Sequence, residues 1–400
     1  MKRIGGKVMQ TKNQFGRAAV WTGKRKMELM EFPIPVAEKD GLVLKVDAAA
    51  VCGTDGHLFP QEPPYPSILG HEITGTIIDM GENANTSVNV YGGPLKVGDR
   101  VALYPWVTCG KCPECVKYGS GTCTVCNQSF VYGVPYENLG LEGEKGIDSA
   151  VSNYPHYMGG FAEYLYVFPE TYLWKIPDDM PSEVAVLLDP AAVAMRAIEI
   201  AQVCPGVVED AFNTNSTVAI IGMGPVGILA AIIARLMGVE KIIAIGSRKA
   251  RLDAVAELAQ VDEIIDIRKV KPEDRIKRVK ELTSGKGADV VLQCANTPNA
   301  FIEGLGMLRR MGTLIEVGNM VNSGTTVAID PAKDICSKHA RIIGMSANNP
   351  GAFDKAFHIL KRHKKIDFMK LYSHITDIEH VGETINKIAD DDYIKGLVKF

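Results

Sequence analysis

The sequence lacks the features that direct a chain to a membrane, to export or to nucleic acid. No apolar run reaches the roughly 18 residues that a membrane-spanning helix needs, and the basic start, residues 1–7, is not followed by the apolar stretch of a signal peptide. The charges nearly cancel, with 44 Lys and Arg against 47 Asp and Glu, a net charge of -3. We therefore expect a cytoplasmic protein with no nucleic-acid or membrane partner.

The cysteines are too unevenly placed for a framework of disulfides. There are nine, an odd number, and five of them lie between Cys109 and Cys126. In a large chain without an export signal, such clustering favours metal binding over disulfides.

The 400 residues suffice for two or three domains, and the character of the chain changes along its length. The first third predicts short strands of a compact β-rich domain, at 42–46, 73–78, 97–103 and 161–167. From residue 216, buried strands alternate with helices: strands at 218–221, 241–245, 263–266, 288–292 and 312–317, with helices at 226–237 and 249–260. This alternation predicts an α/β fold with a doubly wound parallel sheet. The last part, 353–400, is helical and then extended, without such alternation.

Two short strings carry the residues of a candidate metal centre. The first is Cys52-Gly53-Thr54-Asp55-Gly56-His57, and the second is Gly70-His71-Glu72. A thiolate, an imidazole and a carboxylate can hold a zinc ion that keeps one position open for chemistry. The alternative is that Cys52 is a small buried hydrophobe and His71 a hydrogen-bonded core histidine.

A glycine-rich turn predicts dinucleotide binding. Gly222, Gly224 and Gly227, with Pro225 and Val226 between them, follow a predicted strand and open a predicted helix. Such glycines permit a tight turn and close approach to a pyrophosphate, which the helix N-terminus then faces.

The end of the second strand of this alternation favours NADP over NAD. An acidic residue there would bind the ribose hydroxyls and repel a 2′-phosphate, but the chain has Gly246, Ser247 and Arg248. Gly246 leaves room, Ser247 can donate a hydrogen bond and Arg248 can pair with a phosphate. Asp253 lies too far into the helix to replace the acidic residue. The alternative is that Arg248 is a solvated surface residue.

A cysteine-rich loop predicts a structural zinc site. Cys109, Cys112, Cys115 and Cys123 offer four thiolates at short spacings, which close a tetrahedral shell with no place for water. Cys126 is a fifth cysteine, either a free thiol or a competitor for the ion. Together with the first site, this predicts two zinc ions per chain.

The order of these motifs, with Gly159-Gly160-Phe161-Ala162-Glu163-Tyr164 between them, resembles the zinc-dependent medium-chain alcohol dehydrogenases. The resemblance runs from about residue 18 to the C-terminus. It implies a GroES-like catalytic domain (1–189) with a structural zinc lobe at about 104–126. A Rossmann NAD(P)-binding domain (190–345) follows, and the chain then returns to the catalytic domain (346–400).

The resemblance also implies roles at the first metal site. Cys52 and His71 correspond to catalytic zinc ligands, and Glu72 to a ligand that can exchange with water or substrate. Asp189 occupies the place of a further ligand. The best-known members have cysteine there, whereas an acidic residue resembles the secondary-alcohol and polyol branches. The Gly246-Ser247-Arg248 string resembles NADP-dependent secondary-alcohol members, which commonly lack the structural zinc lobe, so the subfamily stays open.

In the reaction that the resemblance implies, a hydride passes between an alcohol or ketone carbon and the nicotinamide. Thr54 would carry the alcohol proton, with His57 as a relay to solvent or a plain exposed histidine. Asp55 would orient His71. Lys395 would contact the pyrophosphate or be a solvated lysine.

Two other functions are compatible with parts of the sequence. A zinc-free quinone or enoyl reductase of the same superfamily would keep the glycine loop and lack the ligands that this chain has. A zinc- and nucleotide-binding regulator would use the cysteine lobe as an interaction module. The substrate, within small secondary alcohols, polyols and amino alcohols, has no linear motif, and the family predicts a homodimer or homotetramer.

Overall fold

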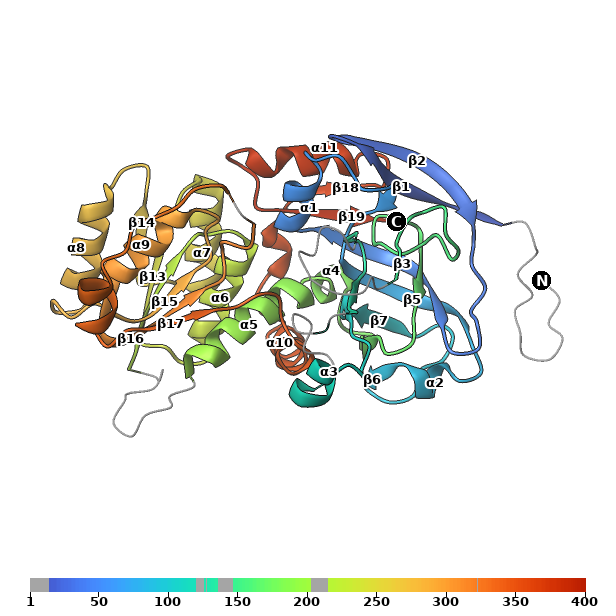
Figure 1. The fold of residues 1–400 in the computed structure, drawn as a ribbon, viewed down its shortest axis with the longest axis horizontal. Coiled ribbons are helices and arrows are strands. Elements are labelled where there is room, and N and C mark those ends of the chain that lie inside the picture. Colours follow the sequence, from blue (N-terminus) through green and yellow to red (C-terminus); the bar gives the residue numbers. More distant parts are fainter. Residues whose placement is uncertain (1–13, 120–125, 127, 136–146, 203–214, 322) are drawn as a thin grey trace.

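A computed structural model describes residues 14–119, 126, 128–135, 147–202, 215–321 and 323–400. The chain forms two units that lie side by side, a β-rich unit and a parallel-sheet unit (Figure 1). Helices α5 (Leu188–Gln202) and α10 (Pro350–Arg362) lie at the junction.

The β-rich unit is built on a sheet of eight described strands. In order these are β18 (Tyr372–Thr376), β19 (Lys395–Lys399), β3 (Leu42–Val51), β5 (Glu72–Met80), β7 (Arg100–Leu103), β11 (Tyr172–Lys175) and β6 (Asn89–Tyr91), with β10 (Tyr164–Val167) also paired to β3. A smaller sheet contains three strands, β1 (Phe15–Gly23), β2 (Lys26–Pro33) and β4 (Ser67–Ile68). A further pair is formed by β8 (Trp106–Val107) and β9 (Phe130–Val131). Short helices connect them: α1 (Gly53–Leu58), α2 (Ala84–Ser87), α3 (Pro113–Tyr118), α4 (Ser182–Ala185), η4 (Phe368–Leu371), α11 (Val381–Asn386) and η5 (Lys387–Ala389).

The C-terminal segment completes this first sheet. Strand β19 lies between β18, to which it is parallel, and β3, to which it is antiparallel. Residues 372–399 thus join a sheet whose other strands come from the first half of the chain.

The parallel-sheet unit contains six described strands, all parallel. Their order is β14 (Glu263–Asp266), β13 (Lys241–Gly246), β12 (Thr217–Ile221), β15 (Ala288–Gln293), β16 (Leu308–Glu316) and β17 (Arg341–Gly344). The connecting helices are α6 (Pro225–Leu236), α7 (Lys249–Ala259), α8 (Pro272–Leu282), α9 (Pro298–Met307) and η3 (Pro331–Cys336). Strands buried on both faces need continuous apolar sequence, which explains the run from Val218 to Ile221. The predicted α/β fold is confirmed.

The largest core runs through the junction of the two units. Helix α5 buries a row of alanines (Ala191, Ala194, Ala197 and Ala201), and their small side chains let it pack closely against α6 and α10. The same cluster contains Trp174 of the β-rich unit and Phe353 of α10. A continuous core of this kind holds the two units in one arrangement.

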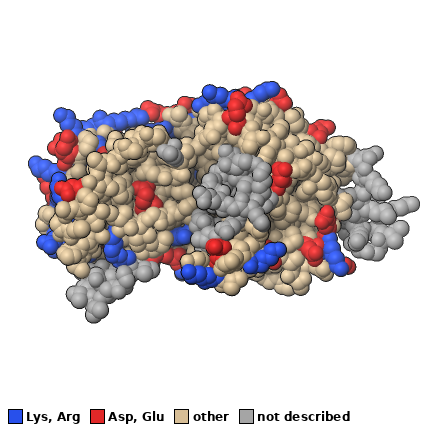
Figure 2. Space-filling view, viewed as in Figure 1, with Lys and Arg blue, Asp and Glu red and all other residues tan. Residues whose placement is uncertain are grey.

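Charges of both signs are interspersed over the described part of the face seen in Figure 2. None of the helices in the described ranges combines the length and apolar character that a membrane crossing requires.

Candidate active site

Strand β3 delivers Cys52 to the start of helix α1. Cys52 is the N-cap, and the carboxylate of Asp55 accepts the Cys52 N–H at 2.8 Å, a capping arrangement that fixes the first turn. The Thr54 hydroxyl lies 3.8 Å from the Cys52 sulfur. Local sequence therefore positions three of the predicted residues.

Pairing of β3 with β5 brings the second string to the first. Ala50 pairs with Glu72, so that His71 and Glu72 arrive beside Cys52. The ligand atoms of Cys52, His71 and Glu72 all lie within 4.8 Å of one another, and His71 and Glu72 are 7% and 1% exposed. The sheet thus gathers a thiol, an imidazole and a carboxylate in one buried place.

The surroundings of His71 fit a bound cation. Its Nδ1 is buried and has no hydrogen-bond partner among the described residues. Burial alone would lower the pKa of His71, but the charges of Cys52, Asp55 and Asp189 outweigh it and raise the pKa to about 10. A place that stabilises positive charge so strongly, with an unpaired imidazole nitrogen, suits a metal ion.

Asp189 lies nearby but outside the group of three whose ligand atoms are within 4.8 Å. It sits in the first turn of α5, is 8% exposed, and accepts a hydrogen bond from the Asn348 side chain at 3.0 Å. Burial raises the pKa of Asp189 to about 6, although the charge of His71 opposes this. Asn348 had no signal in the sequence, because its contact with Asp189 joins residues far apart in the chain.

Lys395 is neither solvated nor free to meet a pyrophosphate, which corrects the sequence-based interpretation. It is 1% exposed, and its ammonium group lies 2.7 Å from one oxygen of Glu72 and donates to the other at 2.9 Å. It also donates to the Val51 carbonyl at 3.2 Å. The reason is the insertion of β19 beside β3, which turns the lysine inward to the carboxylate.

The glycine turn lies between β12 and α6. Gly222 has φ +98°, a conformation that favours glycine, and a Cβ on Gly227 would lie 2.0 Å from the Gly222 carbonyl oxygen. Gly224 is the N-cap of α6, with Pro225 at the first helical position and Val226 after it. The geometry is that of a turn that presents backbone N–H groups to an anion.

The end of β13 has the predicted residues in place. Gly246 is buried as the last strand residue, Ser247 is half-buried, and Arg248 is the N-cap of α7. Arg248 donates to the Ile388 carbonyl of the β-rich unit at 2.7 Å. Asp253 is exposed and pairs with Lys249 at 2.5 Å.

His57 contacts the parallel-sheet unit. Its Nε2 lies 3.0 Å from the side-chain nitrogen of Asn296, which follows β15. His57 is half-buried, and burial lowers its pKa. The sequence contained no signal for this partner.

Comparison with known proteins decides the family. Residues 38–178 match the model of the alcohol dehydrogenase GroES-like domain, and residues 225–362 match that of the zinc-binding dehydrogenases. L-threonine 3-dehydrogenase of Bacillus licheniformis is 30% identical over 322 residues, 78% of each chain. The chain belongs to the zinc-dependent medium-chain alcohol dehydrogenase family.

Other members of this alcohol dehydrogenase family are similar over comparable lengths. Sorbitol dehydrogenase of Bacillus subtilis is 30% identical over 310 residues, covering 76% of this chain and 74% of the relative. The crystal structure of an alcohol dehydrogenase from Thermotoga maritima has a TM-score of 0.83 and 25% identity, covering 97% of this chain and all of that one. The protein is thus an oxidoreductase that interconverts an alcohol and its carbonyl compound with a nicotinamide cofactor.

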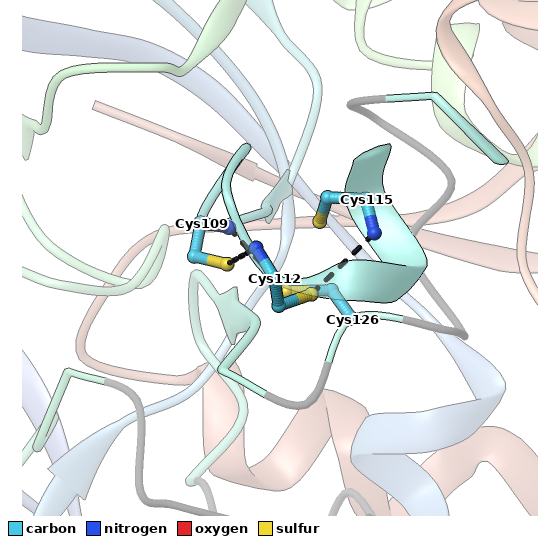
Figure 3. A group of neighbouring side chains, drawn as sticks. All are labelled: Cys109, Cys112, Cys115 and Cys126. Carbon is cyan, nitrogen blue, oxygen red and sulfur yellow. Dashed lines mark hydrogen bonds between the residues drawn. The ribbon is translucent and has the colours of Figure 1, made fainter. Parts of the chain in front are cut away.

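This alcohol dehydrogenase also has four sulfurs gathered in one place, at and near helix α3 (Figure 3). They belong to Cys109, Cys112, Cys115 and Cys126, so Cys126 stands with the three expected cysteines; Cys123 lies outside the described residues. Backbone N–H groups of Cys112, Cys115 and Cys109 donate to the sulfurs of Cys109, Cys112 and Cys126 at 3.3–3.4 Å. Sulfurs that accept N–H groups and lie together fit a thiolate-bound zinc ion.

Proposed function

We propose that this alcohol dehydrogenase acts on a small secondary alcohol or polyol and the corresponding ketone, with NADP as the preferred dinucleotide. The group of half-buried Cys52 with buried His71 and Glu72 carries the proposal, because a thiol, an imidazole and a carboxylate in one place can hold an open zinc site. The similarity to threonine and sorbitol dehydrogenases supports a hydroxyl on a secondary carbon.

Cys52 and His71 would hold the catalytic metal, with Glu72 and Asp189 as the acidic candidates for the remaining position. When bound there, zinc supplies Lewis acidity toward the substrate oxygen. The acidic candidates differ in what holds them: Glu72 is paired with Lys395, and Asp189 with Asn348. Metal binding by Glu72 would therefore compete with an ion pair, and metal binding by Asp189 with a hydrogen bond from an amide.

Thr54, beside the Cys52 sulfur, would receive the alcohol proton, and His57 would pass it toward solvent. Burial, which lowers the pKa of His57, keeps the imidazole neutral and able to accept that proton. Asp55 holds the backbone of Cys52 and acts on His71 through its charge, so it would support both ligands.

The preference for NADP rests on positive charge at the end of β13. Arg248 and Arg251 follow β13, and among the described residues neither forms a salt bridge with a carboxylate. The charge of Arg248 nevertheless contributes, after the hydrogen bond from Arg268, to lowering the pKa of Asp391. Two effects lower the pKa of Arg251 to about 10: burial is the larger, and the positive charge of nearby Arg248 is the second. A 2′-phosphate would relieve this repulsion, which the ribose hydroxyl of NAD cannot do.

A second zinc ion, bound by the cysteine group, would be structural.

The protein would form a homodimer or homotetramer. Strand β17 is at an edge of the parallel sheet and only partly buried, and an edge strand is a place where a second copy can pair. The domains would divide at residues 189 and 345, and the return of β18 and β19 to the first sheet supports this division.

A substrate screen combined with metal analysis tests the proposal. The purified protein is offered secondary alcohols, polyols, amino alcohols and ketones with NADP and with NAD, and its zinc content is measured. We expect two zinc ions per chain, turnover of at least one secondary alcohol, and higher kcat/KM with NADP. Cys52→Ala and His71→Ala should remove one zinc and all turnover while the far-ultraviolet circular dichroism persists. A protein without zinc, or turnover unchanged in both variants, would contradict the proposal.

A further inference from the structure

Three arginines of the parallel-sheet unit hold one short segment of the β-rich unit, the turn 388–393. Arg248 donates to the Ile388 carbonyl at 2.7 Å, and Arg251 donates through Nε to the Tyr393 carbonyl at 2.8 Å. Arg268 pairs with Asp391 between them. The segment is thus fixed from the side where the adenosine end of the dinucleotide is expected.

The same turn leads directly into the catalytic centre. Tyr393 is 3% exposed, and burial, together with the charges of Asp55, Glu72 and Cys52, raises the pKa of its hydroxyl group. Its ring stacks on His374, with centroids 5.3 Å apart. Two residues later, Lys395 begins β19 and pairs with Glu72. The Tyr393 carbonyl therefore lies two residues before the start of the strand that carries this lysine.

Of the three arginines, Arg251 has the contact with most influence on that strand. The side chains of Arg268 and Asp391 are 49% and 70% exposed, and an ion pair so exposed contributes little. Arg248 binds the far end of the turn. Arg251 is half-buried at the near end, and among the described residues no carboxylate is paired with it, so the Tyr393 carbonyl is its principal anchor.

We propose that Arg251 is a positioning residue for the catalytic centre, which by binding the Tyr393 carbonyl keeps β19 where Lys395 pairs with Glu72. The inference rests on the proposed function, because it takes Glu72 and Lys395 to belong to that centre. Its consequence is that a residue beside the adenosine end of the cofactor site affects the position of residues at the metal site. The link runs from α7, beside the adenosine end, through two residues of backbone to the acidic candidate ligand.

The variant Arg251→Gln tests this with two measurements. At saturating cofactor, kcat should fall about ten- to a hundredfold, as for small displacements of catalytic groups. In the cofactor-free enzyme with Co²⁺ in place of the catalytic zinc, the visible absorption spectrum should shift in the direction that Lys395→Gln shifts it. A residue that only binds cofactor would raise the cofactor Kd and leave both quantities unchanged, and that result would overturn the proposal.

Arg278→Gln is the matched control, because it removes one arginine of the same unit from an exposed pair with Glu263. It should leave kcat and the spectrum unchanged. Arg251→Lys keeps the charge but not the planar guanidinium, and it should lie between wild type and Arg251→Gln. If Arg251→Gln does not fold, wild-type values for Arg251→Lys would overturn the proposal. If wild type itself oxidises no alcohol, the proposed function has failed; if only the Arg251 variants behave as wild type, the inference alone has failed.

Discussion

Lys395 and Glu72 form an ion pair in which both side chains are 1% exposed, with nitrogen and oxygen 2.7 Å apart. Removing one member of such a pair leaves the other charge buried without a partner, and this costs about 3–5 kcal/mol. The pair therefore ties the stability of the β-rich unit to Glu72, one of the acidic candidates for the proposed metal site.

Lys395→Met should lower the free energy of unfolding by about 3–5 kcal/mol in urea denaturation. Lys399→Met is the control on the same strand, since Lys399 pairs with Glu183 at 2.7 Å but is 51% exposed. That change should cost below about 1 kcal/mol. Similar losses in the two variants would contradict the assignment of a special role to the buried pair. Adding Glu72→Gln to Lys395→Met should restore part of the stability.

Cys126→Ser should reduce the zinc content from two ions per chain to one and lower the unfolding temperature, while the catalytic zinc stays. The reason is that Cys126 stands within the four-sulfur group. Cys336→Ser, which changes an exposed cysteine, is the control and should keep both ions. Zinc is measured by atomic emission on the dialysed proteins. Two zinc ions per chain in Cys126→Ser would show that Cys126 is a free thiol and not a zinc ligand.

Arg248→Ala should weaken NADPH binding by about ten- to a hundredfold, the value of one charge-assisted hydrogen bond of about 1.5–3 kcal/mol. NADH binding should change much less, because NADH has no 2′-phosphate. Fluorescence titration of both dinucleotides measures this. Tighter binding of NADH than NADPH by wild type, with a harmless Arg248→Ala, would reverse the cofactor preference.

Asp189→Asn should stabilise the metal-free protein at pH 8 but not at pH 4. Burial raises the pKa of Asp189 to about 6, so the folded state holds this proton more tightly than the unfolded state does. The stability that the carboxyl contributes is present below its unfolded pKa and is lost as the pH rises through about 6. At about 1.4 kcal/mol for each pKa unit, the advantage of asparagine should grow by about 3 kcal/mol. Denaturation after chelation of the metal, at both pH values, measures it; an advantage independent of pH would contradict it.

The sequence predicted those features that depend on neighbours along the chain. The alternation after residue 216 reflects strands buried on both faces, and the Gly222 turn follows from a conformation that glycine accepts readily. The grouping of Cys52 with His71 and Glu72 follows from two strings that flank the paired strands β3 and β5. These patterns are local, and local chemistry is visible in sequence.

The contacts that the sequence could not predict join distant segments. Lys395 faces Glu72 only because β19 inserts beside β3, and a lysine near the end of a strand gives no sign of burial. Asn348 reaches Asp189, and Asn296 reaches His57, across separations of 159 and 239 residues. The spacing predicted Cys123 as the fourth sulfur, whereas the described group contains Cys126, because spacing along the chain does not fix which cysteine lies beside the other three.

The place of β19 has a consequence for the order of events during synthesis. The parallel-sheet unit has all its described strands between residues 217 and 344, so it is complete in the growing chain before residue 395 is made. The β-rich unit begins first but lacks β18 and β19, the two strands at one end of its sheet, until this last segment is made. Domains fold in the order in which they emerge when each is continuous. Here the unit that starts first is completed last, because Lys395 becomes available to Glu72 only after the parallel-sheet unit has been synthesised.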